Sequence, residues 1–204
     1  MSAQWIALTR EIKYLPFTMS PLSAEVVLIE GREHLWLFDV GASVDVLESL
    51  LSLPKKPRVI LSHFHPDHRA NLDKLEVDAL YVGTYTYEKV EMGTVVRTPT
   101  LIDDGVKLRI FPLPCSHARG SLALEVNDAY AFLGDAAYST AKQGRIAYNA
   151  TLLKDEIDTL KALNASWFLL SHADPFLQKK EDVLAMLEGI YAQRNPNSPD
   201  IFPR

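Results

Sequence analysis

Three histidines and one aspartate lie in a six-residue run, and this run constrains the fold more than any other feature: His63-Phe64-His65-Pro66-Asp67-His68. It directly follows the apolar residues 59–61, which have the length and composition of a buried strand. His63 and His65 are two positions apart, so in extended chain their side chains leave the backbone on the same side, and Asp67 has the same parity. His68 breaks this alternation and requires a turn, which Pro66 favours. The run therefore predicts a cluster of ligand-type side chains at the end of a strand.

Three further residues of the same chemical types also follow apolar runs that are typical of strands: His117, Asp135 and His172. If these strands belong to one core, their ends meet at one edge and bring the side chains together. Histidine and carboxylate ligands together suit zinc, iron or manganese. A chance match to the first run alone is on the order of one in several thousand at this composition. A solvated loop and a structural site for one metal ion are the alternatives.

The remaining pattern predicts a mixed α/β (α+β) chain. Strands are expected over residues 26–29, 35–38, 59–61, 79–82, 108–111, 122–126, 130–133 and 167–170. Helices are expected over residues 44–51, near residue 72, and over residues 152–163 and 180–194. Two sheets packed together with helices outside accommodate this order in one domain spanning residues 1–204, of which residues 194–204 are expected to be a loosely ordered tail.

The composition limits the classes of partner that we expect for this chain. The 21 basic and 26 acidic residues give a net charge of −5, which argues against a broad nucleic-acid-binding surface. Cys115 is the single cysteine, so a reducing cytoplasmic location is expected. The first residues show no secretory signal pattern, and no stretch is apolar enough for long enough to span a bilayer. The expected partner is a small-molecule substrate, with no nucleic acid and no membrane; the oligomeric state stays open.

These residues resemble the metallo-β-lactamase superfamily of metallohydrolases. The superfamily's motifs are matched in order by Asp39-Val40-Gly41, by the run from His63 to His68, by His117 before Gly120-Ser121, by Gly134-Asp135, and by Ser171-His172. The resemblance covers most of the chain, from Asp39 to His172. It implies the αβ/βα four-layer sandwich, with the site at one edge between the two sheets.

The resemblance also implies a dinuclear site for two divalent ions, with zinc the first choice and iron or manganese the others. His63, His65 and His117 would bind the first ion, Asp67, His68 and His172 the second, and Asp135 would bridge both. Asp39 is expected to orient a ligand histidine or a backbone turn. Two such ions can share a water and lower its pKa, which yields a bridging hydroxide for hydrolysis. Asp67 is predicted to be catalytic as well, by orienting this nucleophile and taking its proton.

Asp135 indicates the branch. A bridging aspartate resembles the glyoxalase II-like and lactonase-like enzymes, so the predicted reaction is hydrolysis of a small ester, thioester, lactone or phosphoester. His65 argues against the di-iron oxygen reductases, which resemble this pattern but carry Glu at that position. The alternative is an oxidoreductase of the persulfide-dioxygenase type with a single iron. A non-catalytic binding protein is the third hypothesis, although such proteins normally lose ligands and this chain retains all seven.

Four residues are candidates for substrate contacts. Tyr138 is also predicted to be catalytic: it lies three residues after Asp135, a spacing similar to that of acyl-homoserine-lactone lactonases, in which the tyrosine hydroxyl faces the substrate; packing in the core is the alternative. Arg119 is a candidate for binding an anionic group, or else a solvated loop residue. Lys142 and Arg145, in a predicted loop over residues 139–149, are candidates for an anion-binding rim, or else a solvated surface.

Overall fold

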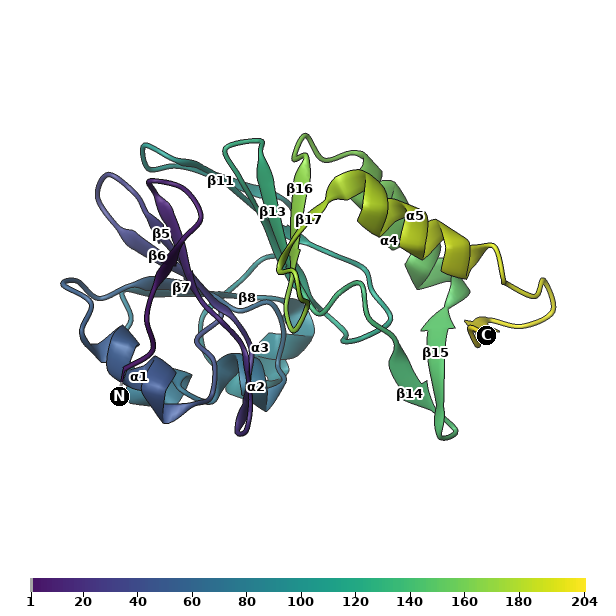
Figure 1. Cartoon of the computed structure of the whole chain (residues 1–204), viewed down its shortest axis with the longest axis horizontal. Coiled ribbons are helices and arrows are strands. Elements are labelled where there is room, and N and C mark those ends of the chain that lie inside the picture. Colours follow the sequence, from purple (N-terminus) through teal and green to yellow (C-terminus); the bar gives the residue numbers. More distant parts are fainter. Residues whose placement is uncertain (1) are drawn as a thin grey trace.

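A computed structural model describes residues 2–204 of the chain. Its larger sheet has seven strands, and the ribbon view shows it on the N-terminal side of the molecule (Figure 1). In spatial order the strands are β1 (Ile6–Ala7), β2 (Ile12–Leu15), β5 (Val26–Glu30), β6 (Leu35–Phe38), β7 (Arg58–Ile60), β8 (Ala79–Val82) and β9 (Thr94–Val95). The pairs from β6 to β9 are parallel, and those from β1 to β6 are antiparallel.

The second sheet has six strands. In spatial order they are β10 (Thr100–Asp103), β11 (Lys107–Pro112), β12 (Leu122–Val126), β13 (Tyr130–Gly134), β16 (Trp167–Leu170) and β17 (Leu177–Lys179). The pair β13–β16 is parallel and the others are antiparallel. Because β13 and β16 run in the same direction, the residues that follow them emerge at the same edge of the sheet.

Helices cover the outer face of each sheet (Figure 1). The larger sheet is covered by α1 (Val44–Leu51), α2 (Pro66–Arg69) and α3 (Thr84–Val90), with a 3₁₀ turn at Leu72–Lys74, and the second sheet by α4 (Ala150–Lys161) and α5 (Lys180–Tyr191). Two of the helices, α1 and α4, begin at side-chain caps: Ser43 accepts a hydrogen bond from the amide of Val46, and Asn149 from that of Leu152. The predicted arrangement, two sheets packed together with helices outside, is confirmed.

Strand alternation produces the apolar layers. In β5, Val27 and Ile29 face the second sheet, whereas Val26 and Leu28 face α1 and its neighbours. All four side chains are buried, which explains why this strand reads as a continuous apolar run. The layer between the two sheets is closed from the other side by residues such as Ile110 and Phe132. A third layer packs α4 and α5 against the outer face of the second sheet.

Two predictions about the C-terminal half were wrong. The segment predicted as a loop forms the hairpin of β14 (Thr140–Lys142) and β15 (Arg145–Asn149). The predicted loose tail adds β18 (Asp200–Ile201) to β15, with the side chain of Ile201 buried. Strand pairing and burial of one apolar side chain hold this end of the chain, and its Pro- and Asn-rich composition does not reveal either. A further small hairpin, β3 (Thr18–Met19) with β4 (Leu22–Ser23), precedes β5.

No helix formed by residues 2–204 combines the length and the apolar character that crossing a bilayer requires.

Candidate metal centre

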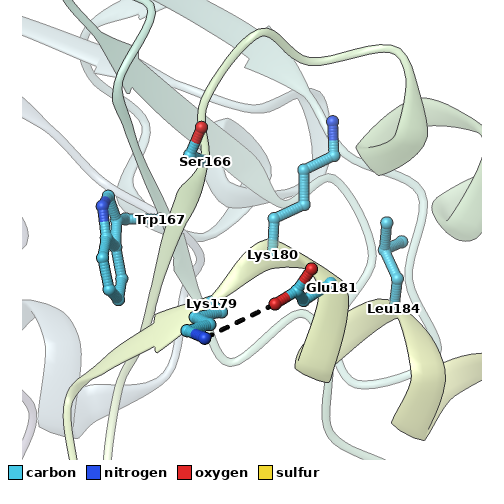
Figure 2. A pocket seen from close by; sticks show the side chains of 6 residues that line it. All are labelled: Ser166, Trp167, Lys179, Lys180, Glu181 and Leu184. Carbon is cyan, nitrogen blue, oxygen red and sulfur yellow. Dashed lines mark ion pairs between the residues drawn. The ribbon is translucent and has the colours of Figure 1, made fainter.

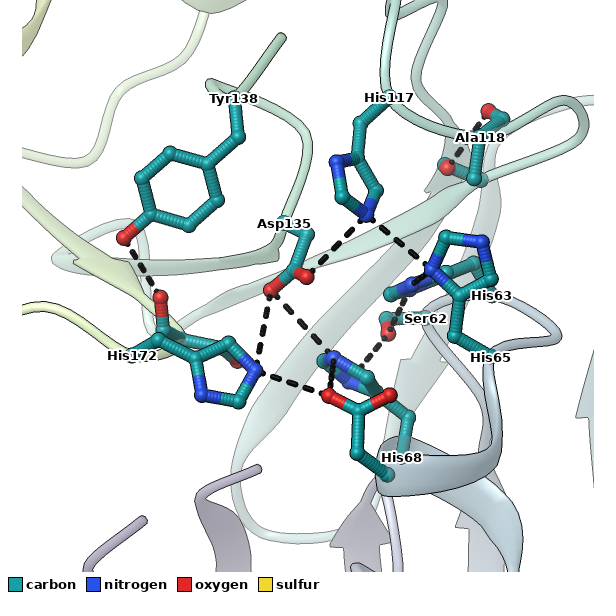
Figure 3. Close-up of polar contacts among 12 residues, drawn as sticks. Ser62, His63, His65, His68, His117, Ala118, Asp135, Tyr138 and His172 are labelled. Atoms are coloured by element: carbon teal, nitrogen blue, oxygen red, sulfur yellow. Dashed lines mark hydrogen bonds and ion pairs between the residues drawn. The ribbon is translucent and has the colours of Figure 1, made fainter. Parts of the chain in front are cut away.

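Seven side chains from four separate segments converge at one edge of the two sheets (Figure 3). They form two groups that share one member. The first group contains His63, His65, His117 and Asp135, and the second contains Asp67, His68, Asp135 and His172. Within each group the potential ligand atoms all lie within 4.8 Å of one another. The structure thus brings together every residue that the sequence singled out as a metal ligand.

The first group is built mainly from imidazoles. His63 Nε2 lies 2.9 Å from His65 Nδ1, which in turn lies 3.1 Å from His117 Nε2. Asp135 Oδ2 lies 3.2 Å from His117 Nε2 and completes the group. Three ring nitrogens and a carboxylate oxygen therefore point at one small volume, which is the donor set that zinc prefers.

The second group is richer in carboxylates. Asp67 Oδ2 lies 3.0 Å from His172 Nε2 and 3.4 Å from His68 Nε2. Asp135 Oδ1 lies 3.3 Å from His68 Nε2 and 3.8 Å from His172 Nε2. Helix α2 produces this arrangement, because Pro66 at its first position turns the chain and moves His68 to the inner side.

Asp39 lies beneath the cluster and is fully buried. Its Oδ1 accepts a hydrogen bond from the amide of Ser62, and its Oδ2 accepts one from the Ser62 hydroxyl, both at 2.7 Å. The same Oδ2 lies 2.7 Å from His68 Nδ1. Asp39 therefore contacts a ligand-type histidine and a backbone turn at once, the two kinds of contact that the sequence suggested as alternatives.

Contacts behind the rings decide which nitrogen faces the cluster. His63 Nδ1 lies 2.9 Å from the Ser62 hydroxyl, and His117 Nδ1 lies 3.0 Å from the Ser139 carbonyl. Together with the contact from His68 to Asp39, these partners leave the Nε2 atoms of three rings pointing inward. Metal-binding histidines usually have their second nitrogen held in this way.

The electrostatics differ between the groups. Burial lowers the pKa of His63 well below its ordinary value, and the pKa of His65 is lowered by burial and by His117. Burial also opposes the charge on His68, but the carboxylates of Asp39 and Asp135 outweigh it and raise the pKa to about 10. Burial would raise the pKa of Asp135, yet the neighbouring imidazoles of His117 and His68 keep it far below its usual range.

Two buried atoms show that the site fits a metal ion. His68 Nε2 and Asp135 Oδ1 are buried and face each other at 3.3 Å, but neither makes a hydrogen bond with acceptable geometry within residues 2–204. Buried polar atoms normally have a partner, because leaving one unpaired costs about 1–3 kcal/mol. A cation between them would supply the missing partner to both atoms.

The hydroxyl of Tyr138 does not face the opening between the two groups. It donates a hydrogen bond of 2.6 Å to the carbonyl of Ser171, the residue before His172 (Figure 3). This arrangement thus differs from the expected contact between hydroxyl and substrate, because the half-buried phenol donates its hydrogen bond to a nearby backbone carbonyl. Burial raises the pKa of Tyr138 above its ordinary value, and the charge of Asp135 adds to this.

The three basic candidates have different surroundings. Lys142 forms an ion pair with Asp200, and the guanidinium of Arg145 lies 4.5 Å from the centroid of the Phe202 ring. Both side chains therefore bind the C-terminal segment. Arg119 is exposed, in the loop between His117 and Gly120. A substrate-binding role for these three residues stays a prediction.

Sequence reasoning missed two residues that contact His172. Glu25 is 2% exposed and accepts a hydrogen bond of 2.9 Å from the amide of His172. The ring of Phe17 meets that of His172 edge-on, with the centroids 5.8 Å apart. Both precede β5, 147 positions from His172 in the case of Glu25, so local patterns do not connect them. A charged residue at the start of an apolar strand was the one available signal.

The structure also contains a cavity that is remote from the cluster. It has a volume of about 410 Å³ and lies where β16 begins, whereas His172 follows the other end of that strand (Figure 2). Its lining comes from β16, β17 and the start of α5: Ser166, Trp167, Lys179, Lys180, Glu181 and Leu184. None of the seven cluster residues contributes to it.

Comparison with known proteins shows the fold. No protein-family model matches the sequence, and a search of curated proteins finds no match. A single-substitution variant of a flavo di-iron protein from Thermotoga maritima superposes with a TM-score of 0.73 at 13% identity, over 96% of this chain and 63% of that one. The chain therefore spans less than two thirds of that protein.

Two other solved structures are similar over most of their length. A metallo-β-lactamase superfamily protein from Sulfolobus tokodaii has a TM-score of 0.63 at 17% identity, over 93% of this chain and 90% of that one. A metallo-β-lactamase from Cronobacter sakazakii has a TM-score of 0.69 at 14% identity, over 94% of this chain and 88% of that one. These likenesses and the His/Asp cluster confirm the predicted resemblance to the metallo-β-lactamase superfamily in fold.

Proposed function

We propose that this chain, which has the metallo-β-lactamase fold, is a dinuclear metal-dependent hydrolase of a small ester, thioester, lactone or phosphoester. One observation carries the proposal: two groups of ligand-type atoms overlap in the single carboxylate of Asp135. Its Oδ2 lies with the first group and its Oδ1 with the second. A bridging carboxylate of this kind allows two cations to lie close enough to share one water.

His63, His65 and His117 would hold the first ion and Asp67, His68 and His172 the second, with zinc the preferred ion for this donor set. When bound, the pair of ions supplies Lewis acidity and lowers the pKa of a shared water. The protein orients the ligands. Asp39 contacts Ser62 and His68 and so holds the ligand side chains on the side of the cluster that is closed to solvent.

The other side of the cluster is open. His117, His172 and Asp67 retain 20%, 18% and 15% side-chain exposure, whereas His68 has none. A substrate would approach from the exposed side. The side chains that pack edge-on against cluster residues include Phe17, on His172, and Phe64, on His65. These two aromatic side chains offer apolar contacts to the groups that flank the bond to be cleaved.

Asp67 is the proposed proton acceptor. Its carboxylate is more exposed than that of Asp135, 15% against 8%, so it reaches both the cluster and solvent. Because Oδ2 already contacts His172 and His68, the other oxygen of the same carboxylate is the one that can take the proton of the attacking water. The leaving group then recovers a proton from the same side chain or from solvent.

The test is a panel of ester, thioester, lactone and phosphodiester substrates, assayed with protein loaded with zinc, manganese or iron. We expect turnover of at least one class with two metal equivalents per chain, and loss of turnover in His65→Ala. Activity that saturates at one metal per chain would contradict the dinuclear route.

The same samples test the oxidoreductase hypothesis. Oxygen uptake by the iron-loaded protein with glutathione persulfide, together with no hydrolysis of any panel member, would replace the hydrolase proposal. A protein that binds both metal ions and turns over nothing would favour the binding-protein hypothesis.

A further inference from the structure

His172 has a backbone conformation that needs support. Its φ is +62°, in the left-handed region that non-glycine residues rarely adopt. Such conformations cost about 1–3 kcal/mol and persist where the surrounding structure fixes them. His172 lies two residues beyond the end of β16 at Leu170, so the ladder of hydrogen bonds in the sheet does not fix its backbone. Other contacts must provide the support.

One peptide unit receives this support from two directions. The carbonyl of Ser171 accepts a hydrogen bond from the Tyr138 hydroxyl at 2.6 Å. The amide of His172, which belongs to the same peptide unit, donates to Glu25 Oε2 at 2.9 Å. Tyr138 comes from the segment after β13 and Glu25 directly precedes β5, so the two contacts link opposite sheets through one peptide plane.

This peptide sets the direction of a proposed ligand. We propose that Glu25 and Tyr138 are positioning residues: their hydrogen bonds hold the Ser171–His172 peptide and so orient the His172 imidazole toward the second metal ion. The inference rests on the proposed dinuclear site. It assigns to Tyr138 a role through His172 and not through the substrate, and it assigns a role to a buried carboxylate that no sequence motif indicated.

The geometry separates the two metal positions. Neither Glu25 nor Tyr138 makes a hydrogen bond to His63, His65 or His117 among the contacts of residues 2–204. The Tyr138 ring meets that of His117 edge-on, with the centroids 6.4 Å apart, and Tyr138→Phe keeps this ring contact while it removes the hydroxyl. Loosening the peptide should therefore weaken the second ion and spare the first. Residues that orient a metal ligand typically contribute 10–100-fold to metal affinity.

The experiment measures zinc binding by competition with a chromogenic chelator, which resolves two affinities per chain. We expect Tyr138→Phe and Glu25→Met each to weaken the second zinc by about 10-fold and to leave the first unchanged. Glu25→Gln keeps an acceptor oxygen and should retain wild-type affinity. Because both contacts fix one peptide, the double variant Tyr138→Phe/Glu25→Met should lose less than the product of the two single losses.

Tyr148→Phe is the matched control. Tyr148 is a buried tyrosine that, like Tyr138, donates to a backbone carbonyl, that of Ala137 at 3.3 Å, but no hydrogen bond joins it to residues 171–172. Its substitution should leave both zinc affinities unchanged. If Glu25→Met does not fold, Tyr138→Phe removes a single oxygen atom and decides the question alone.

The inference is overturned if Tyr138→Phe leaves the second zinc affinity unchanged, if both affinities fall equally, or if Glu25→Gln is as damaging as Glu25→Met. Failure of the proposed function is a different result. If wild-type protein binds two zinc ions but hydrolyses no substrate, the positioning role of Glu25 and Tyr138 still stands. Wild-type protein that binds no zinc at this cluster overturns both.

Discussion

The two halves of the metal cluster are supported in different ways. In the first half, His63, His65 and His117 contact one another, and their outer partners are a hydroxyl and a backbone carbonyl. In the second half, buried carboxylates stand behind the ligands: Asp39 contacts His68, and Glu25 contacts the backbone of His172. The first half is built mainly from imidazoles, and in the second half the imidazoles are backed by carboxylates.

This difference shows how one edge of the two-sheet sandwich can provide two metal-binding positions with different electrostatics. Burial and neighbouring imidazoles lower the pKa of His63 and His65, so these rings are neutral and ready to bind a cation. Burial opposes protonation of His172, but Asp67 raises its pKa. A metal ion must therefore displace protons from the second half, and we expect the first half to bind its ion more tightly.

The largest effect is expected where the halves overlap. Asp135→Ala removes a ligand from both groups, so metal content should fall from two ions per chain and activity should fall by more than about 100-fold, the upper limit for a residue that only supports a ligand. Metal analysis after dialysis and turnover of the best panel substrate measure this. Retention of two ions would show that Asp135 does not bridge them.

Two single-ligand variants separate the halves. His65→Ala should lose the first ion and His172→Ala the second, so each should retain about one metal per chain while activity falls in both. Zinc titration with chelator competition distinguishes the two residual affinities. Identical residual affinities in the two variants would mean that the halves are not independent positions.

The charge network should appear in the stability of the metal-free protein. Asp39→Ala leaves His68 with one fewer buried carboxylate, and breaking a buried pair of this kind typically costs 3–5 kcal/mol. Asp78→Ala is the control, because Asp78 pairs with Arg58 at the surface and such pairs contribute about 0–1 kcal/mol. Urea unfolding measures both, and equal losses would remove Asp39 from its supporting role.

A buried carboxylate outside the cluster gives the smallest effect. Glu156 in α4 is fully buried, and neither of its oxygens has a hydrogen-bond partner in the described chain. Burial raises its pKa well above the ordinary value of 4.5, so folding takes up a proton, and the free energy of unfolding decreases as the pH rises above 4.5.

Glu156→Leu removes this dependence. The free energy of unfolding of the variant, relative to that of wild type, should increase by up to about 1.4 kcal/mol for each pH unit between pH 6 and pH 8. The increase should stop where Glu156 ionises in the folded protein. Urea unfolding of the two metal-free proteins at both pH values measures the difference. A variant less stable than wild type at both values would reveal an unseen partner of Glu156.

Sequence patterns predicted the parts of the fold that repeat locally. The strands β5, β6, β12, β13 and β16 and the helix α1 were found because their apolar spacing is set by burial on one or both faces. The ligand-type residues were found because they follow such strands. Short edge strands such as β14 and β18 were missed, since pairing with a distant segment defines them and their composition does not.

The supporting residues of the site were the hardest to predict. Asp39 was identified through a family motif, whereas Glu25 has no motif and reaches His172 only after both sheets have formed. The spacing of Tyr138 from Asp135 suggested a substrate contact, but the structure turns its hydroxyl to the Ser171 carbonyl. Contacts between segments more than a hundred positions apart are fixed by the packing of the sheets, and no local pattern encodes them.

Anomalous X-ray scattering from zinc-loaded crystals tests the central claim most directly. Two zinc peaks are predicted about 3.5–4 Å apart, one among His63, His65 and His117 and the other among Asp67, His68 and His172, with Asp135 between them. A single peak in this cluster, or zinc bound elsewhere with these side chains turned apart, would contradict the account.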